Sequence, residues 1–208
     1  NRKGHILMLS KELGKVSPPL SKFLSRVAPE LKDEDVVVRK PRSIPRSRNF
    51  VGRCYLFNYR NPVGKCKPDL PYYHIFPMVI NLEQREKTML ALNPFYLPPN
   101  LREDLIENLL SRLIGDVEDE DARSRITYKI IAKYRRSLRT AFPCIKQYRH
   151  NLMSPVVLEM KPSLWREFYL GDISKKHSTF FVGRSPRSVW GESVVISKEM
   201  GRDRRRKQ

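Results

Sequence analysis

The sequence predicts an α+β protein: a small antiparallel sheet, either a meander or an open barrel, packed with three to four helices and flanked by extended basic arms. Short β-rich segments separated by turns occupy residues 50–95, helical periodicity follows from residue 98, and the basic excess lies mostly at the two ends. The expected division is a basic N-terminal arm with a short helix (1–49), an α+β core domain (50–171) and a basic C-terminal arm (172–208).

The charge of the chain indicates a polyanionic partner. The 208 residues include 41 Lys and Arg but only 22 Asp and Glu, a formal net charge of +19 with a pI near 10.1. Residues 1–50 and 175–208 each carry +7, whereas residues 51–174 carry only +5. Such an excess most often accompanies nucleic-acid binding.

Several classes of protein are disfavoured by composition. No segment approaches the roughly 18 consecutive apolar residues of a membrane span. Cys54, Cys66 and Cys144 are too few and too scattered for a disulfide framework, which favours a reducing environment. Cys54, Cys66 and His74 lack the spacing of a zinc site, so no metal and no cofactor is expected.

In the N-terminal arm, one short helix and one linker are predicted. Ser17 is a candidate cap, Pro18 and Pro19 suit a first helical turn, and Pro29 ends or kinks the helix. Its apolar face would consist of Leu20, Phe23, Leu24 and Val27. Residues 39–49 follow as a proline-interrupted basic segment, which we interpret as an extended linker without regular pairing.

The predicted sheet comes from three segments. Residues 50–60, 74–82 and 87–95 are rich in β-branched and aromatic residues and are separated by turns. One buried face across three successive strands suggests an antiparallel arrangement. Pro77 places its strand at an edge or marks a bulge.

From residue 98 the period becomes helical. Residues 98–115 have leucines at i+4 spacing, with Asn100 as a candidate cap and Gly115 as a candidate stop. Further helices are predicted over 123–138 and 143–153, then a strand over 155–160 and a short helix over 163–170 that ends at Gly171.

The run from Lys129 to His150 is the strongest candidate for phosphate binding, because it contains seven cations and no acid. On the predicted helix, cations form two stripes away from the apolar seam, where neutralising phosphates would release counterions. The alternative is a solvated face balanced by the acidic residues 116–121. The candidate residues are Lys129, Lys133, Arg135, Arg136, Arg139, Lys146 and Arg149.

The two basic arms supply a second set of candidates. They resemble arms that follow a nucleic-acid backbone, and the alternative is a disordered, solubilising tail. The sequence has no helix-turn-helix, zinc-finger or RNP signature, so base specificity is not expected. The candidates are Arg42, Arg46 and Arg48 in the linker and Arg204, Arg205 and Arg206 near the C-terminus.

Aromatic residues cluster before the second predicted strand. Tyr72, Tyr73 and Phe76 could stack on unpaired bases. They lie between a proline-rich turn and a strand, where large aromatic residues normally close a hairpin over the core, so packing is favoured.

No enzyme is indicated by the motifs. The four histidines share no local partner pattern, and the sequence has no nucleophile elbow, P-loop or HExxH motif. The acids of residues 116–121 could hold Mg²⁺ in a nuclease, but contiguous acids on a loop are usually just solvated.

Six segments follow one another in a characteristic order: YLFNYRNP (55–62), LPYYHIFPMVINL (70–82), LNPFYLPPNLRE (92–103), RITYKII (125–131), AFPCIKQY (141–148) and MSPVVLEMKPSLW (153–165). This order of motifs resembles a known family of virion proteins from large contractile-tailed (T-even-like) bacteriophages, the DNA end protector or head-completion proteins. The resemblance covers roughly residues 50–170, with a weaker similarity in SVWGES (188–193). The chain departs from the family at His74, where an aspartate is usual, and at residues 92–98, which lack the usual glycine and histidine.

This resemblance implies a non-enzymatic structural protein on the terminus of packaged double-stranded DNA. It would bind DNA ends without sequence preference, protect them from exonucleases and complete the head. It would contact portal or neck subunits in the head–tail neck region of the virion, and would be in the host cytoplasm during assembly. It supplies no catalytic residues, and the matching residues have an architectural character: Tyr72, Tyr73, Phe76, Pro77, Asn93, Tyr96, Leu97 and Pro98.

Two alternatives remain open from the sequence. One is a neck, tail or baseplate component whose arms extend between protein subunits. The other is a ribosomal-type ribonucleoprotein component, which would prefer A-form RNA or RNA loops.

Overall fold

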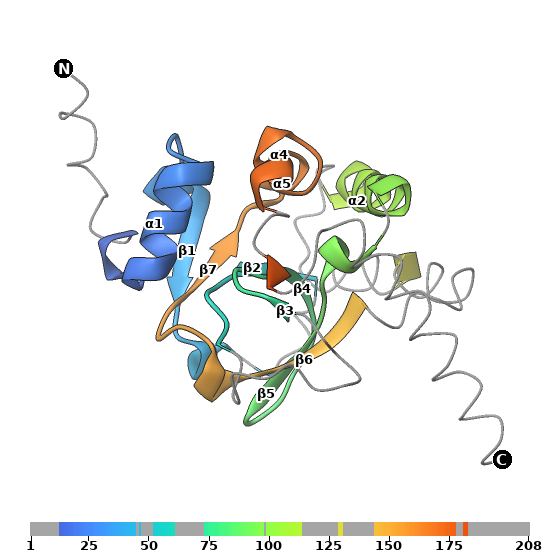
Figure 1. Cartoon of the computed structure of the whole chain (residues 1–208). Coiled ribbons are helices and arrows are strands. Elements are labelled where there is room, and N and C mark those ends of the chain that lie inside the picture. The colour runs from blue at the N-terminus through green and yellow to red at the C-terminus, as the bar shows by residue number, and fades with distance from the viewer. Residues whose placement is uncertain are drawn as a thin grey trace, which may run out of the picture.

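A computed structural model describes residues 13–44, 46, 52–60, 73–97, 99–113, 129–130, 144–177 and 181–182. Its centre is a six-stranded antiparallel sheet in the order β1-β7-β2-β4-β5-β6 (Figure 1). These strands are β1 (Val36–Arg39), β2 (Cys54–Leu56), β4 (Met78–Gln84), β5 (Thr88–Leu92), β6 (Ile145–Arg149) and β7 (Val157–Met160). A separate pair consists of β3 (Tyr73–His74) and β8 (Phe181–Val182).

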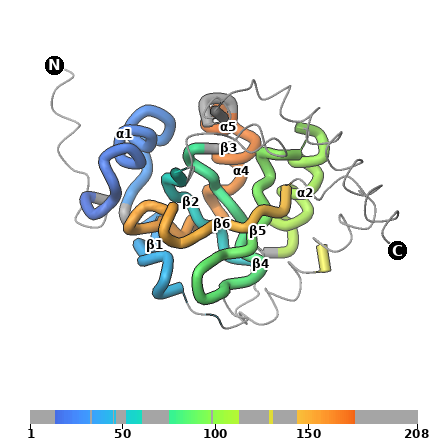
Figure 2. The backbone as a smooth tube through the Cα atoms, turned by 60° about the horizontal axis from the view of Figure 1, so that its bottom comes forward, coloured from blue at the N-terminus to red at the C-terminus, as the bar shows by residue number. Residues whose placement is uncertain are grey.

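Four helices complete this part of the chain. They are α1 (Pro18–Val27), α2 (Pro99–Leu113), α4 (Trp165–Tyr169) and α5 (Asp172–His177). The tube view shows the chain crossing between the helices and the strands several times (Figure 2). None of the helices described here is long and apolar enough to cross a membrane. The predicted α+β class, with an antiparallel sheet and about four helices, is confirmed.

The sheet has a buried apolar cluster on each face. Alternate residues of β2 separate in the way that strand geometry requires: Cys54 and Leu56 join the cluster beneath the helices, and Tyr55 joins the opposite one. The helix-side cluster includes Leu20, Phe23, Leu24, Met78, Ile80, Leu105, Leu109, Trp165 and Phe168. The opposite cluster consists of Ile44, Tyr55, Phe57, Val79, Met89, Ala91, Tyr148, Met153 and Val157.

The predicted helices α1, α2 and α4 are confirmed, although their caps differ from expectation. All four residues of the predicted apolar face of α1 are buried, but the Ser17 side chain forms no capping hydrogen bond. The prediction that Asn100 caps α2 is wrong, because the helix already begins at Pro99. Gly115 lies outside the described residues. Helix α5 was not expected.

The most important correction concerns residues 143–153, for which the sequence predicted a helix. Residues 145–149 form β6, which pairs with β5 over its whole length, from Leu92 with Ile145 to Thr88 with Arg149. The spacing of Ile145 and Tyr148 suits a helix, but pairing with a distant strand prevails over this local pattern. Consecutive side chains of this segment therefore point to opposite faces of the sheet.

Two further expectations about proline are wrong. Pro77 does not place its strand at an edge, since β4 lies between β2 and β5 and Pro77 comes just before it. The irregularity of β4 lies instead between Asn81 and Glu83. The linker predicted from Arg39 is not unpaired at its start: Arg39 pairs with Val157 in the sheet, and a 3₁₀ turn with buried Pro41 follows.

Aromatic packing is confirmed where the structure describes it. The ring of Phe76 is buried and stacks on Phe23 at 4.4 Å between centroids. Tyr96 is also buried. Only the backbone of Tyr73 is described, as part of β3, and Tyr72 lies outside the described residues.

One partly buried carboxylate joins three strands. Glu159 on β7 forms ion pairs with Arg39 on β1 and with Arg53, which precedes β2. Gly52, which directly precedes Arg53, has a φ of 81°, a conformation that residues with a side chain rarely adopt. Its N–H donates to the Asn81 carbonyl at 2.7 Å, which starts the pairing of β2 with β4.

Candidate nucleic-acid interface

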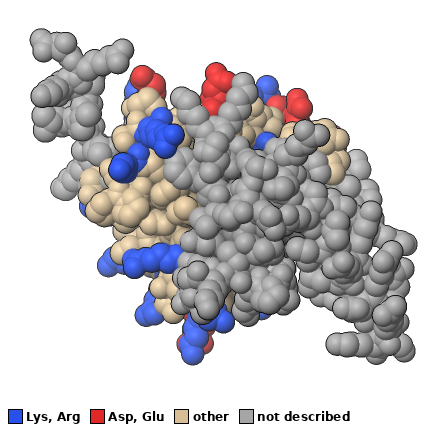
Figure 3. All heavy atoms as spheres, viewed as in Figure 1, with Lys and Arg blue, Asp and Glu red and all other residues tan. Residues whose placement is uncertain are grey.

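Exposed cations gather at one end of the sheet, where β5 begins and β6 ends. Arg42, Arg46, Lys87 and Arg149 all have exposed side chains. On the face shown in Figure 3, Lys and Arg lie along the lower edge of the described part and also at its upper left, whereas most of the visible acidic side chains lie at the upper edge. In Figure 1 the lower edge carries the turn between β4 and β5.

Backbone pairing brings these cations together from distant parts of the sequence. Thr88 and Arg149 are partners in the β5–β6 register. The next N–H along the chain, that of His150, donates to the Lys87 carbonyl at 3.0 Å. The Gln84 side chain donates through Nε2 to the Pro41 carbonyl at 3.2 Å, which holds the turn carrying Arg42 against β4.

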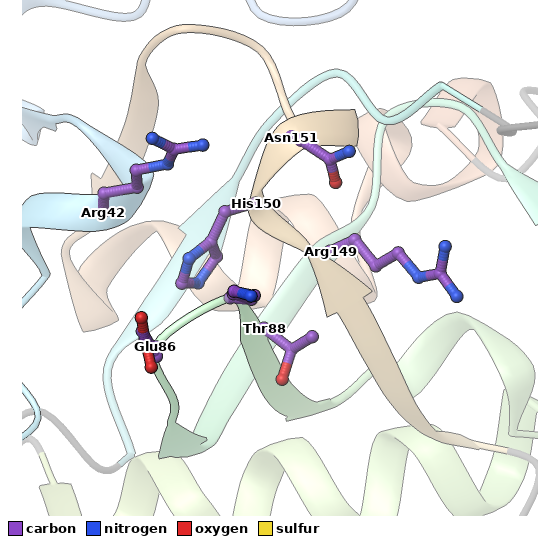
Figure 4. A pocket seen from close by; sticks show the side chains of 7 residues that line it. Arg42, Glu86, Thr88, Arg149, His150 and Asn151 are labelled. Atoms are coloured by element: carbon purple, nitrogen blue, oxygen red, sulfur yellow. The ribbon is translucent and has the colours of Figure 1, made fainter.

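A cavity of about 620 Å³ lies between these segments (Figure 4). Arg42 and Arg149 lie on opposite sides of the His150 ring in this view, and Glu86 lies beyond the tip of the ring. The residues that line the cavity are Arg42, Glu86, Lys87, Thr88, Arg149, His150 and Asn151.

The cations of this region are not neutralised within the described part of the chain. There, Arg42, Arg46, Lys87 and Arg149 form no ion pair. The neighbouring Arg85 differs, since it pairs with Glu83 at 2.8 Å. Unpaired, exposed guanidinium and ammonium groups at a cavity are suited to anions, because each retains free N–H donors.

His150 forms the floor of the cavity and is only 6% exposed. Burial lowers its pKa below the usual value of about 6.5, and the positive charges of Arg42 and Arg46 lower it further, while the nearby Glu86 carbonyl acts in the opposite direction. The ring is therefore neutral at pH 7. Its Nε2 is 2.8 Å from Gln84 Nε2.

The structure places the predicted phosphate-binding residues in different surroundings. Arg42 and Arg149 line the cavity, Arg46 lies near enough to lower the pKa of His150, and Lys129 is exposed on a short described helical segment elsewhere. Lys146 lies on the opposite face of β6 from Arg149. The remaining candidates lie outside the described residues: Lys133, Arg135, Arg136, Arg139, Arg48, Arg204, Arg205 and Arg206.

Lys146 is held against an aromatic ring. Its ammonium nitrogen lies 4.2 Å from the centroid of the Tyr96 ring, within the range of a cation–π contact. Burial lowers the pKa of Lys146 to about 8. This placement favours a role in joining β6 to the 3₁₀ turn Pro94–Tyr96 over a role in contacting a ligand.

Of the residues that line the cavity, sequence analysis named only Arg42 and Arg149 as candidates; among those it missed, Lys87 and His150 matter most to the site. Lys87 belongs to the charged turn between two strands, which has no motif of its own. His150 ended a run interpreted as helical, so its neighbours in space were not evident. The alternation of Ile145, Gln147 and Arg149 against buried Tyr148 is the signal that could have identified β6.

No group of three or more His, Cys, Asp or Glu side chains suited to a metal ion occurs in the part of the chain that the structure describes. Cys66 and the acidic residues 116–121 fall outside it. Burial raises the pKa of the Cys144 thiol to about 12 and also raises that of Cys54. Both described thiols are therefore protonated at neutral pH, which disfavours a nucleophilic role.

Comparison with known families identifies the proteins to which the chain is related. The chain has no significant match among curated proteins or among solved structures. Residues 33–185, more than half of the chain, match the family model described as phage T4 terminal DNA protecting protein. This match confirms the resemblance found in the sequence and spans all the cavity residues. The chain therefore belongs to the family of the phage T4 terminal DNA protecting protein.

Proposed function

We propose that the protein binds the end of packaged double-stranded DNA, without sequence preference, and shields it from exonucleases. As a member of its family, the chain is a phage DNA terminus protecting protein. The observation that carries the finer proposal is a group of exposed cations at or beside one cavity that form no ion pair within the described residues: Arg42, Arg46, Lys87 and Arg149.

Binding would rest on phosphate neutralisation. Each Lys or Arg that meets a phosphate releases condensed counterions, and this contribution is independent of sequence. Arg42 and Arg149 offer planar guanidinium groups that bind phosphate oxygens in pairs, whereas Lys87 acts as a point charge. The basic residues of the run from Lys129 and of the two arms would add contacts along the duplex, as the sequence predicts.

Protection requires no bond to be made or broken. An exonuclease must hold the terminal nucleotides to begin digestion, so a protein that occupies them excludes it sterically. We infer a structural, non-enzymatic role on this ground.

The proposal extends to the place of the protein in the particle. A protein on the terminus of packaged DNA would be part of the virion in the head–tail neck region and would complete the head beside portal or neck subunits. It would meet these partners in the host cytoplasm during assembly. The family supports virion association.

Exonuclease protection tests the function directly. A linear duplex labelled at both ends is incubated with the protein at physiological salt and then digested with a double-strand exonuclease. Full-length duplex should survive with wild-type protein, and a variant with Arg42→Gln, Lys87→Gln and Arg149→Gln should protect much less. Digestion of a nicked circle, which begins internally, is the control. Unchanged digestion of the linear duplex with wild-type protein would contradict the proposal.

A further inference from the structure

The cavity beside β6 carries a net positive charge. Three cations, Arg42, Lys87 and Arg149, line it against one carboxylate, Glu86, which leaves a formal charge of +2 with His150 neutral. An internal phosphodiester of DNA carries about one negative charge. A phosphate monoester carries about −1.5 to −2 at pH 7. The charge of the cavity therefore matches a monoester better than a diester.

Hydrogen bonding fixes the tautomer of His150. The Pro41 carbonyl can only accept, so the Gln84 atom 3.2 Å from it is the amide nitrogen. The same nitrogen is 2.8 Å from His150 Nε2 and donates its second hydrogen to it. His150 Nε2 is thus an acceptor without a proton. In the neutral ring the proton lies on Nδ1.

The Nδ1–H group of His150 is poorly satisfied: the Glu86 carbonyl lies near the ring but forms no hydrogen bond of normal geometry with Nδ1. Among the described residues, Nδ1 is buried and has no hydrogen-bond partner within normal geometry. A buried donor without a partner is unfavourable, because it has lost its hydrogen bond to water. In Figure 4 the ring lies among the lining side chains, between Arg42 and Glu86. An anion in the cavity would supply a stronger acceptor than the Glu86 carbonyl.

We propose that this cavity binds the terminal phosphate monoester of a DNA end, with Arg42, Lys87 and Arg149 meeting its charge and His150 Nδ1–H donating to one oxygen. The inference rests on the proposed function and specifies how an end differs from the interior of a duplex. An internal phosphate is joined to sugars on both sides and lies along a convex backbone. A terminal phosphate is joined on one side only, so it can enter a recess.

The test compares blunt duplexes of one sequence that differ only at their ends. One carries 5′-phosphates, one carries 3′-phosphates, and one carries only hydroxyl groups. Binding is followed by fluorescence anisotropy at fixed salt, with covalently closed circular duplex as competitor. We expect one of the phosphorylated duplexes to bind about tenfold more tightly than the hydroxyl duplex, since a charge-assisted hydrogen bond typically contributes this much. Which one binds more tightly identifies the strand end.

Substitutions of cavity residues test whether the preference for a phosphorylated end arises at the cavity. Lys87→Gln and Arg149→Gln should each remove most of the preference for a phosphorylated end, measured as the ratio of the dissociation constants of the hydroxyl and phosphorylated duplexes, whatever each costs in overall affinity. Lys22→Gln, which removes an exposed cation from α1, is the matched control and should keep the full preference.

The outcomes separate this inference from the proposed function. If all three duplexes bind equally and still outcompete the circle, the protein recognises DNA ends. The cavity then does not recognise a terminal phosphate, and the inference is wrong. If none outcompetes the circle, end recognition itself fails. A phosphate preference that survives both cavity variants would also overturn the assignment.

Discussion

Two regions of the molecule use polar side chains in different ways. Between the helices and the sheet, two large buried side chains use their polar atoms within the fold: Tyr169 donates to the Met78 carbonyl at 2.9 Å and Trp165 to the Met160 carbonyl at 3.3 Å. Around the cavity at the end of β6, the cations have no carboxylate partner within the described residues, and the buried His150 Nδ1 forms no hydrogen bond of normal geometry there. The first arrangement stabilises the fold, whereas the second leaves binding capacity for a ligand.

This difference implies that stability and DNA binding are separable. Substitutions beneath the helices should lower the free energy of unfolding. Substitutions at the cavity should change affinity with little effect on the fold, because exposed cations contribute little to stability.

The largest effect is expected from Trp165→Ala. Trp165 is 1% exposed in the helix-side cluster, and removing such a side chain costs about 3–5 kcal/mol in lost burial and cavity formation. Urea denaturation measures the change. Arg166→Gln on the same helix is the control, since its exposed pair with Glu107 contributes at most about 1 kcal/mol. Equal losses for the two variants would contradict the assigned core.

A smaller loss of stability is expected from Glu159→Gln. This carboxylate forms ion pairs with Arg39 and Arg53 and is only 12% exposed, so its neutralisation removes two partly buried ion pairs at once. We expect a destabilisation of about 2–3 kcal/mol, at the lower end for a broken buried pair. The exposed Glu103→Gln serves as the control in the same denaturation series. If the two variants were equally stable, the Glu159 pairs would have no structural role.

DNA binding should respond to the cavity cations through its salt dependence. Replacing both Arg42 and Arg149 with Gln should reduce the slope of log K against log [salt] by about 2, since each phosphate contact contributes about 0.9. Thermal unfolding should be nearly unchanged. The same double change at Lys22 and Lys161, both exposed and outside the cavity lining, is the control. Identical slopes for both double variants would mean that exposed cations contribute equally to DNA binding wherever they lie, and that the cavity has no special role.

The smallest effect concerns pH. The folded pKa of His150 is lowered, so below about pH 6.5 the unfolded chain binds a proton that the folded chain does not. Stability should therefore fall as the pH decreases through this range, by at most about 1.4 kcal/mol per pH unit. Comparing wild type with His150→Gln from pH 7.5 to 5 isolates this residue from the other three histidines. A variant with the same pH dependence as wild type would contradict the buried, neutral ring.

The sequence predicted most reliably what is decided locally. The apolar faces of α1 and α2 follow from their own periodicity, and the burial of Phe76 follows from its position between a turn and a strand. The strand β6 was misassigned because Ile145 and Tyr148 also fit a helix, and only the pairing with β5 decides between the two. The cavity could not be predicted for the same reason: Arg42, Lys87 and Arg149 come together only through strand order, which no local pattern specifies.

The measurement that tests the central claim most directly is competition between linear and covalently closed circular duplex of the same sequence at physiological salt. The account predicts that the protein prefers the linear form and that the cavity variants lose this preference. Equal, weak binding to both forms that disappears at moderate salt would contradict it, and would favour a neck, tail or baseplate component whose charge meets protein neighbours.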